Sequence, residues 1–389
     1  MKIVVVAGLD ASLLNFRGPL LRCLVKLGHE VIAAAPRETT GVPEALGRMG
    51  VDYEATEFTR AGLNPVADLR ALLRLREVLQ RRRPDIVLSY TIKPVIYGSL
   101  AARMAGVPRI YALVTGLGSA FHASGFKGRL LRGAAMCLYR LAFRACARVL
   151  VQNSDIAALF VREKLVEAEK ISVVHGSGVD TEHFSPSPFP DADPVFLYVG
   201  RLLRDKGIAE LVSAAGLVQK LCPQVRVRLV GDIDPNPTSF SAEDLKVWQR
   251  DGIIEWLGFQ HDVRPHLQRC TAFVLPSYHE GLPRSVLEAM AVGRPVITTD
   301  TIGCRETISR AGNTDAAGVR VGENGLLVPA KSIEPLAQAM IRLARDSSLC
   351  ARMGVRGRRL ALERFDVRQI NRQMLVAMDL EQPEASASR

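Results

Sequence analysis

The sequence lacks the features that would mark a secreted, metal-clipped or membrane-spanning protein. Its seven cysteines are an odd number and no two are closer than nine positions, which argues against a disulfide framework and a CxxC metal site. No run of eighteen apolar residues occurs, so no helix is expected to span a membrane. The N-terminus begins with a strand pattern instead of a signal peptide. These absences favour a cytoplasmic protein with reduced thiols.

Acidic residues are scarce in the first half of the chain. Residues 1–190 contain 25 Lys and Arg against 16 Asp and Glu, whereas residues 191–389 contain 26 against 24. Such a surface could attract nucleic acid, an anionic membrane or a phosphorylated substrate. No aromatic stacking platform or known binding motif accompanies the charge, so no nucleic-acid partner is expected. In the basic stretches 70–83 and 127–148, we expect the apolar residues to pack on the sheet and the charge to draw the domain to an anionic membrane surface.

Short Val- and Ile-rich runs alternate with longer segments of helical period along the chain. This alternation predicts an α/β fold with two doubly wound, Rossmann-like domains facing across a cleft. Four prolines in residues 180–194 indicate an extended linker between them. The expected division is 1–185 for the first domain, 186–194 for the linker, 195–365 for the second domain, 366–380 for a closing helix and 381–389 for a disordered tail.

A basic loop follows the first apolar strand of the second domain. Residues 200–207 read GRLLRDKG and lead from a strand into a helix, with Arg201 and Lys206 five positions apart. Such a loop, at the carboxyl edge of a sheet and a helix N-terminus, can bind a phosphate. The alternative is a solvated basic loop in which Asp205 pairs one cation.

A second candidate site surrounds two glutamates. Glu280 ends a strand-to-helix loop, Gly281 permits close approach of the backbone, and Glu288 stands among apolar helix residues. A carboxylate in such surroundings needs a partner, and ribose hydroxyls are one. A capping or salt-bridged helix residue is the alternative for Glu288.

Together, these motifs resemble the family-4 retaining glycosyltransferases of the GT-B fold. The resemblance rests on GRL at 200–202, KG at 206–207 and PSYHEGLP at 276–283 with Glu288. Two further segments, GCRET at 303–307 and ENGLLVP at 323–329, also resemble motifs of that family. The resemblance implies that Arg201 and Lys206 hold the donor diphosphate, that Glu280 lies beside the donor sugar and that Glu288 binds the ribose. Gly281 and Leu282 would complete the donor site.

The first half resembles a subset of the family that builds bacterial surface glycans. SYTIKP at 89–94 and TGLGSAF at 115–121 carry this resemblance, and His122, just beyond, is predicted to be an exposed loop histidine. Members of the subset add a sugar to a lipid-diphosphate-linked acceptor. Gly8 stands where the family often has two adjacent glycines near the donor, and this chain lacks the pair.

No metal cofactor is expected. The triplet DID at 232–234 lies in a Pro- and Asn-rich loop and is predicted to form a turn, not a metal site. Arg201 and Lys206 would instead neutralise the leaving diphosphate.

The sequence therefore predicts an enzyme that moves a hexose or N-acetylhexosamine from a UDP-sugar to a lipid-diphosphate-linked saccharide. We expect it to work in the cytoplasm, peripherally at the cytoplasmic face of the inner membrane. A sugar-nucleotide epimerase of the same fold and a non-catalytic nucleotide-sugar-binding protein are the alternatives.

Overall fold

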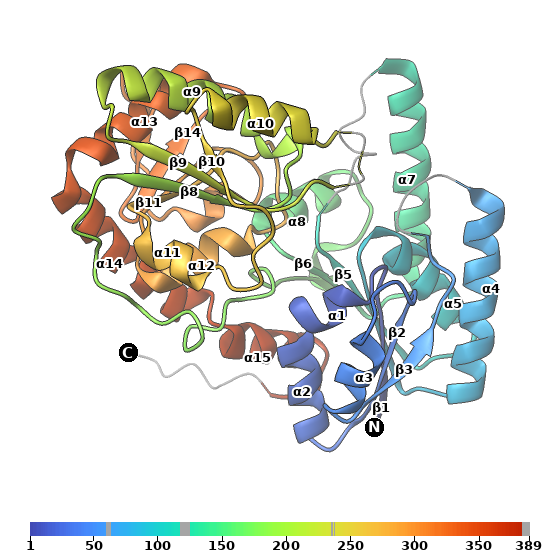
Figure 1. Cartoon of the computed structure of the whole chain (residues 1–389). Helices are drawn as coiled ribbons and strands as arrows, with labels where there is room; N and C mark the ends of the chain where they lie inside the picture. The colour runs from blue at the N-terminus through green and yellow to red at the C-terminus, as the bar shows by residue number, and fades with distance from the viewer. Residues whose placement is uncertain (60–63, 117–124, 235, 237, 383–389) are drawn as a thin grey trace. The chain divides into compact units, whose positions relative to one another are not determined.

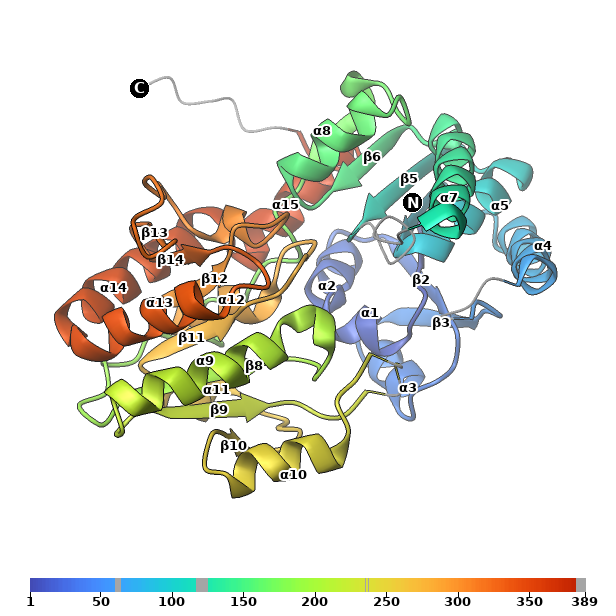
Figure 2. The ribbon, with the colours of Figure 1, turned by 90° about the horizontal axis from the view of Figure 1, so that it is seen from above.

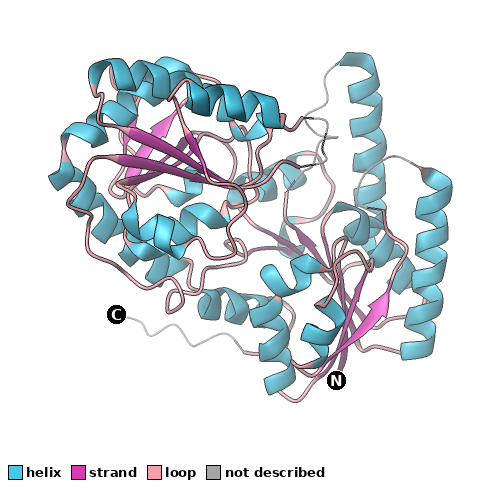
Figure 3. Cartoon of the chain, viewed as in Figure 1, coloured by secondary structure: helices cyan, strands magenta, loops and turns pink. Residues whose placement is uncertain are grey.

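The computed structural model describes residues 1–59, 64–116, 125–234, 236 and 238–382. The chain divides into two compact units, one comprising Met1–Ser177 with Arg368–Arg389 and the other comprising Gly178–Val367. Each unit is built around one seven-stranded sheet (Figure 1). Helices cover both faces of each sheet (Figure 3). The predicted α/β class with two doubly wound domains is confirmed.

The first sheet has the strand order β3-β2-β1-β4-β5-β6-β7, and all its described pairings are parallel. Its topology reverses between β1 and β4, which are neighbours in the sheet. In chain order its elements are β1 (Lys2–Val6), α1 (Ala11–Asn15), α2 (Gly18–Lys26), β2 (Glu30–Ala35), α3 (Val42–Gly47), β3 (Val51–Ala55), α4 (Pro65–Arg82), β4 (Ile86–Tyr90), η1 (Pro94–Gly98), α5 (Ser99–Met104), β5 (Arg109–Val114), α7 (Gly125–Ala145), β6 (Arg148–Val151), α8 (Ser154–Arg162), η2 (Ala168–Lys170) and β7 (Ile171–Val173).

The second sheet has the order β10-β9-β8-β11-β12-β14-β13, parallel except for the pair of β13 and β14. Its elements are β8 (Val195–Val199), η3 (Arg204–Lys206), α9 (Ile208–Leu221), β9 (Arg226–Val230), α10 (Ala242–Arg250), β10 (Glu255–Trp256), α11 (Arg264–Arg269), β11 (Ala272–Leu275), α12 (Arg284–Val292), β12 (Val296–Thr299), η4 (Arg305–Thr307), β13 (Arg320–Val321), β14 (Gly325–Val328), α13 (Ile333–Arg345) and α14 (Ser347–Arg364). The strands β8, β11 and β12 are adjacent, so the loops that follow them meet at one edge of the sheet.

The residues predicted to form an extended linker, 186–194, belong to the second unit and pack on it. Arg294 is 1% exposed and donates hydrogen bonds to the carbonyl oxygens of Ser187 (3.2 Å) and Pro188 (2.8 Å). Val179 and Phe184, which precede this stretch, belong to the hydrophobic core of the second unit. The boundary between the units therefore falls at Ser177–Gly178, before the predicted 186–194.

The last helix, α15 (Val367–Ala377), follows the second unit in sequence but packs in the first. Its Ile370 and Met374, with Met378 just beyond it, lie in the core of the first unit. The hydroxyl of Tyr111, on β5, donates a hydrogen bond to the Met378 carbonyl oxygen at 2.9 Å. The predicted closing helix, 366–380, is thus an integral part of the first domain. Of the predicted tail, 381–389, residues 383–389 lie outside the described residues.

Candidate functional site

Arg201 and Lys206 lie in the loop that leads from β8 into α9, as predicted. The Arg201 side chain is 52% exposed and its Nη1 lies 3.3 Å from Oδ2 of Asp234. A single helical turn, η3, follows and brings Lys206 to the start of α9. Gly207, with a φ of 72°, is the N-cap residue of that helix and has no side chain that could cap its first N–H groups. The loop therefore carries the exposed Arg201 and the half-buried Lys206, and Lys206 directly precedes the N-cap residue of α9.

Lys206 and Glu280 form an ion pair across two adjacent loops. The Lys206 Nζ lies 2.5 Å from Glu280 Oε1, and the two side chains are only 19% and 16% exposed. They meet because β8 and β11 are neighbours in the sheet, so the loops beyond them lie side by side. In the absence of another ligand, each of these groups neutralises the other. Removing one partner of such a partly buried pair lowers the free energy of unfolding, because the remaining charge is left without compensation.

Close backbone packing fixes the Glu280 loop between its two neighbours. A Cβ at Gly207 would collide with the carbonyl oxygen of Pro276, and a Cβ at Gly303 with that of Glu280. The Tyr278 N–H donates to the Asp205 carbonyl oxygen at 2.9 Å, and the Glu280 N–H donates to that of Ile302 at 3.1 Å. Only glycine tolerates such close approach together with a positive φ. The loops that follow β8, β11 and β12 are therefore held in a fixed arrangement, which we call the cradle.

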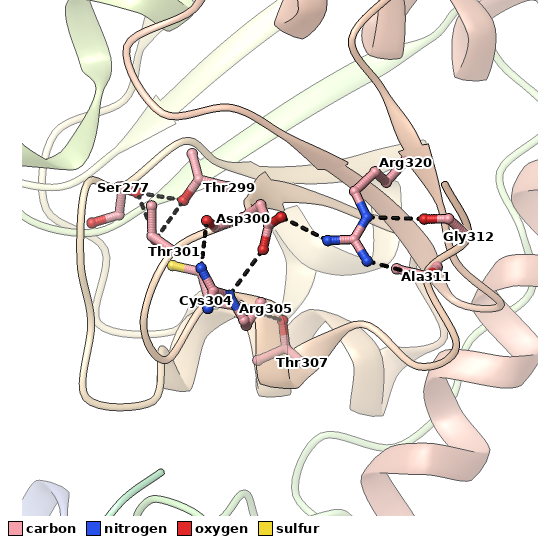
Figure 4. Close-up of polar contacts among 10 residues, drawn as sticks. All are labelled: Ser277, Thr299, Asp300, Thr301, Cys304, Arg305, Thr307, Ala311, Gly312 and Arg320. Atoms are coloured by element: carbon pink, nitrogen blue, oxygen red, sulfur yellow. Dashed lines mark hydrogen bonds and ion pairs between the residues drawn. The ribbon is translucent and has the colours of Figure 1, made fainter. Parts of the chain in front are cut away.

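An arginine clamp holds the third of these loops, beyond β12 (Figure 4). The Asp300 carboxylate lies 2.9 Å from Arg305 Nε and 2.6 Å from Arg320 Nη1. Arg320 also donates through Nε to the Gly312 carbonyl oxygen at 2.9 Å. Asp300 thus ties residues 300–303, which contact Glu280, to the segment before β13. The sequence alone does not single out Asp300, although this residue directly follows β12 and so lies at the same edge of the sheet.

Glu288 lies on α12, where its side chain is 13% exposed and its Oε1 is 3.0 Å from Arg284 Nε. Burial raises the pKa of Glu288 to about 7, against the opposing effect of the Arg284 guanidinium. Glu288 is therefore a salt-bridged helix residue, as the alternative prediction had it. Leu282 is buried at 9% exposure, and Gly281 is half-buried, with its carbonyl oxygen packed against Gly303.

Asp232 and Asp234, predicted to form a turn, lie in the loop after β9, where residues 232–234 have no assigned turn but both carboxylates accept backbone hydrogen bonds. The Asp234 Oδ1 accepts a hydrogen bond from the Asn236 N–H at 2.9 Å, and the Asp232 Oδ1 accepts one from the Ile233 N–H at 2.8 Å. The contact of Asp234 with Arg201 was not predicted, because 33 residues separate the two in sequence. Across the part of the chain that the structure describes, no three His, Cys, Asp or Glu side chains gather as a metal site would require.

Gly8 belongs to the first unit, whereas the other predicted site residues belong to the second. It follows β1 at the reversal point of the sheet, where open α/β sheets bind ligands. A Cβ on Gly8 would lie 2.8 Å from Thr91 Oγ1, so the loop after β4 approaches its backbone closely. Thr91 itself has a φ of 69°, a conformation that β-branched residues rarely adopt. Most of the motif at 115–121, and His122, lie outside the described residues.

Two family models together match most of the chain. The model described as "Glycosyl transferase 4-like domain" matches residues 18–176, and that described as "Glycosyl transferases group 1" matches residues 193–346. A relative from Campylobacter jejuni, N,N'-diacetylbacillosaminyl-diphospho-undecaprenol alpha-1,3-N-acetylgalactosaminyltransferase, is 32% identical over 90% of this chain and 91% of its own length. An Escherichia coli relative, UDP-Gal:alpha-D-GlcNAc-diphosphoundecaprenol alpha-1,3-galactosyltransferase, is 27% identical over 73% of this chain and 72% of its own.

Solved structures show the same fold. The complex of Anabaena HepE with UDP and glucose has a TM-score of 0.73 and 21% identity, covering 97% of this chain and 99% of that one. The sucrose-phosphate synthase of Thermosynechococcus elongatus has a TM-score of 0.77 and 19% identity, covering 96% and 97%. At this level of identity, the structural likeness concerns the fold alone.

Proposed function

The chain belongs to the group 1 glycosyl transferases, and we propose that it moves a sugar from a UDP-sugar to a saccharide carried on a polyprenyl diphosphate. The observation that carries this proposal is the 32% identity, over 90% of the chain, to an enzyme that extends bacillosaminyl-diphospho-undecaprenol. The E. coli relative also acts on a sugar linked to diphospho-undecaprenol. An N-acetylhexosamine or a hexose is the proposed cargo.

The donor would bind at the cradle of loops in the second unit. Arg201 and Lys206 would hold the diphosphate, because they lie in one loop and Lys206 directly precedes the N-terminal end of α9, where the first N–H groups of a helix favour anions. Glu288 would accept hydrogen bonds from the ribose hydroxyls, while Gly281 and Leu282 would line the site. Gly8 is retained as a proposed donor contact from the first unit.

Donor binding would divide the Lys206–Glu280 pair. As the diphosphate arrives, Lys206 would turn to a phosphate oxygen and leave Glu280 to accept hydrogen bonds from the sugar hydroxyls. The bond from the anomeric carbon to the diphosphate would then break while the acceptor oxygen attacks from the same face, with retention of configuration. The acceptor proton would pass to the leaving phosphate oxygen. Arg201 and Lys206 would stabilise the charge on that leaving group, so no metal is required.

The enzyme would act in the cytoplasm at the inner face of the inner membrane. A polyprenyl chain keeps the acceptor in the bilayer, and the excess of positive charge in residues 1–190 suits an anionic surface. No helix in the described ranges has both the length and the apolar character of a membrane span.

A donor panel tests this function. Purified protein would be incubated, in EDTA, with UDP-linked and other nucleotide sugars and with a polyprenyl-diphosphate-linked sugar, and the products read by mass spectrometry. Transfer from one UDP-sugar is the expected result. UDP-sugar binding without transfer to any lipid-linked acceptor would contradict the acceptor class, whereas transfer that requires an added divalent ion would contradict the role of the two cations.

Affinity for the UDP-sugar is expected to rise about tenfold from about pH 6 to about pH 8, because the ionised Glu288 accepts ribose hydrogen bonds better than the neutral acid. With its pKa at about 7, Glu288 is mostly protonated at the lower pH and mostly ionised at the higher.

The raised pKa of Glu288 also lowers folding stability as the pH rises through about 7, since the folded chain holds a proton that the unfolded chain has released.

Calorimetric titration with UDP-sugar at several pH values measures this effect, since its diphosphate has no proton to lose in that range. Glu288→Gln should bind more weakly and with a flat pH dependence. A profile in the variant as steep as in the wild type would assign the titration to another group.

A further inference from the structure

Helix α4 exposes apolar side chains on the face turned away from its sheet. Its inner face buries Ala71, Leu72, Leu75 and Leu79, whereas Val66, Leu69 and Leu73 are 70%, 56% and 39% exposed. These three follow the spacing i, i+3, i+7, so they form one stripe. Together with Arg70, Arg74 and Glu77, they line a shallow hollow on the surface.

Helix α7 carries a similar stripe and no acidic residue at all. Leu130 and Leu141 are 70% and 45% exposed, and the small side chains of Ala134 and Cys137 continue the exposed line between them. Tyr139 and Phe143, on the opposite face, are buried. The prediction that the apolar residues of 127–148 pack on the sheet is therefore wrong for Leu130 and Leu141.

The two stripes lie on the same side of the first unit. Both α4 and α7 contact α5 and η1, which lie between them. Figures 1 and 2 show α4 and α7 running in the same direction on either side of α5. Each helix leads into a parallel strand, β4 or β6, so each begins at the carboxyl edge of the sheet. Val66, Leu69 and Leu130 are therefore close to the edge at which the Gly8 loop lies.

The charge around these stripes is positive. The sequences of α4 and α7 contain ten Lys and Arg and two Asp and Glu, and one of the two acids, Asp68, is buried in an ion pair with Lys93 at 2.7 Å. Residues 86–154 contain no Asp or Glu. Arg70, Arg74, Arg129 and Arg144 are exposed beside the apolar side chains. Apolar side chains flanked by arginine suit the boundary between lipid headgroups and acyl chains.

The geometry points to the outward faces of α4 and α7 as the surface that docks this enzyme on an anionic lipid bilayer. A second copy of the chain fits this surface less well, because a two-fold interface would bring the same arginines together. This inference deepens the proposed function: a bilayer at this surface holds the lipid-linked acceptor near the carboxyl edge of the first sheet. The leucines enter the headgroup region, and the arginines bind lipid phosphates.

Flotation with vesicles that contain no sugar donor or acceptor tests the surface alone. Wild-type protein should bind phosphatidylglycerol vesicles and bind phosphatidylcholine vesicles poorly, with affinity falling as salt rises. The double variant Leu69→Gln/Leu130→Gln should bind at least about tenfold more weakly, and each of Arg70→Gln and Arg74→Gln about fivefold. The matched control, Leu221→Gln/Leu362→Gln, alters leucines of the second unit that are 59% and 40% exposed and should bind as the wild type does.

Melting temperatures and transfer to a soluble, short-chain acceptor should be unchanged in Leu69→Gln/Leu130→Gln, which separates loss of docking from loss of folding or of sugar transfer. If wild-type protein does not bind phosphatidylglycerol vesicles at low salt, the inference is overturned. Equal binding by the double variant and the wild type would overturn it as well. A concentration-dependent dimer that the same two substitutions abolish would identify a second copy as the occupant and would also overturn it.

Discussion

Lys206→Ala is expected to lower kcat for sugar transfer by about 10² to 10³ and to weaken binding of UDP-sugar and of free UDP alike. The substitution removes a cation proposed to hold the diphosphate. It also leaves the carboxylate of Glu280, only 16% exposed, without the ammonium that lies 2.5 Å away. An unpaired carboxylate in this position repels an incoming diphosphate, so both changes act in the same direction.

Steady-state kinetics and calorimetric titration with UDP measure these effects. Lys220→Ala provides the matched control, because Lys220 is an exposed lysine near the other end of α9. It should behave as the wild type in both measurements. Equal affinity for UDP in Lys206→Ala and the wild type would exclude the diphosphate role, whatever happens to the rate.

Glu280→Gln should have the opposite signature, losing about 10² or more in transfer rate while keeping or gaining affinity for UDP. Glutamine preserves the shape of the side chain but not its charge. Lys206 then loses its carboxylate partner and remains available to the diphosphate. Free UDP carries no sugar, so the contacts proposed between Glu280 and the sugar cannot contribute to its binding.

Single-turnover transfer and UDP titration, compared in the same preparation, separate the two properties. Glu255→Gln serves as a control, since Glu255 pairs with Arg226 and Arg228 at β10, a strand on the far edge of the same sheet. Unchanged turnover in Glu280→Gln would refute its assignment to the donor sugar. A fall in UDP affinity as large as that in Lys206→Ala would make the ion pair a structural unit instead.

The strands and loops that carry the site could be predicted, because the sequence of a buried parallel strand is a short run of apolar residues. Three strands do not carry a signal of this kind. The first, β3, alternates acidic with apolar residues, and β7 and β13 have only three and two residues. All three stand at the edges of their sheets, where one side of the strand is unpaired and the sequence need not be apolar throughout.

Contacts between residues far apart in sequence could not be predicted. The pairing of Lys206 with Glu280 spans 74 residues, and that of Asp300 with Arg320 spans 20. The prolines of residues 186–194 indicate an extended chain. No feature of the neighbouring sequence shows, however, that Arg294 donates hydrogen bonds to its carbonyl oxygens. A single sequence thus predicts which loops carry charged residues. The ion-pair partner of each charged residue depends on the fold and cannot be predicted in this way.

The position of α15 has a consequence for the order in which the chain is completed during synthesis. The second unit is one continuous stretch, Gly178–Val367, so every residue of its core has left the ribosome before α15 does. The first unit begins emerging earlier but receives Ile370, Met374 and Met378 only after the whole of the second unit has been synthesised. Until then, the part of its core that these side chains cover stays open to water, and a nascent chain is exposed to aggregation there for the whole time that the second unit takes to emerge.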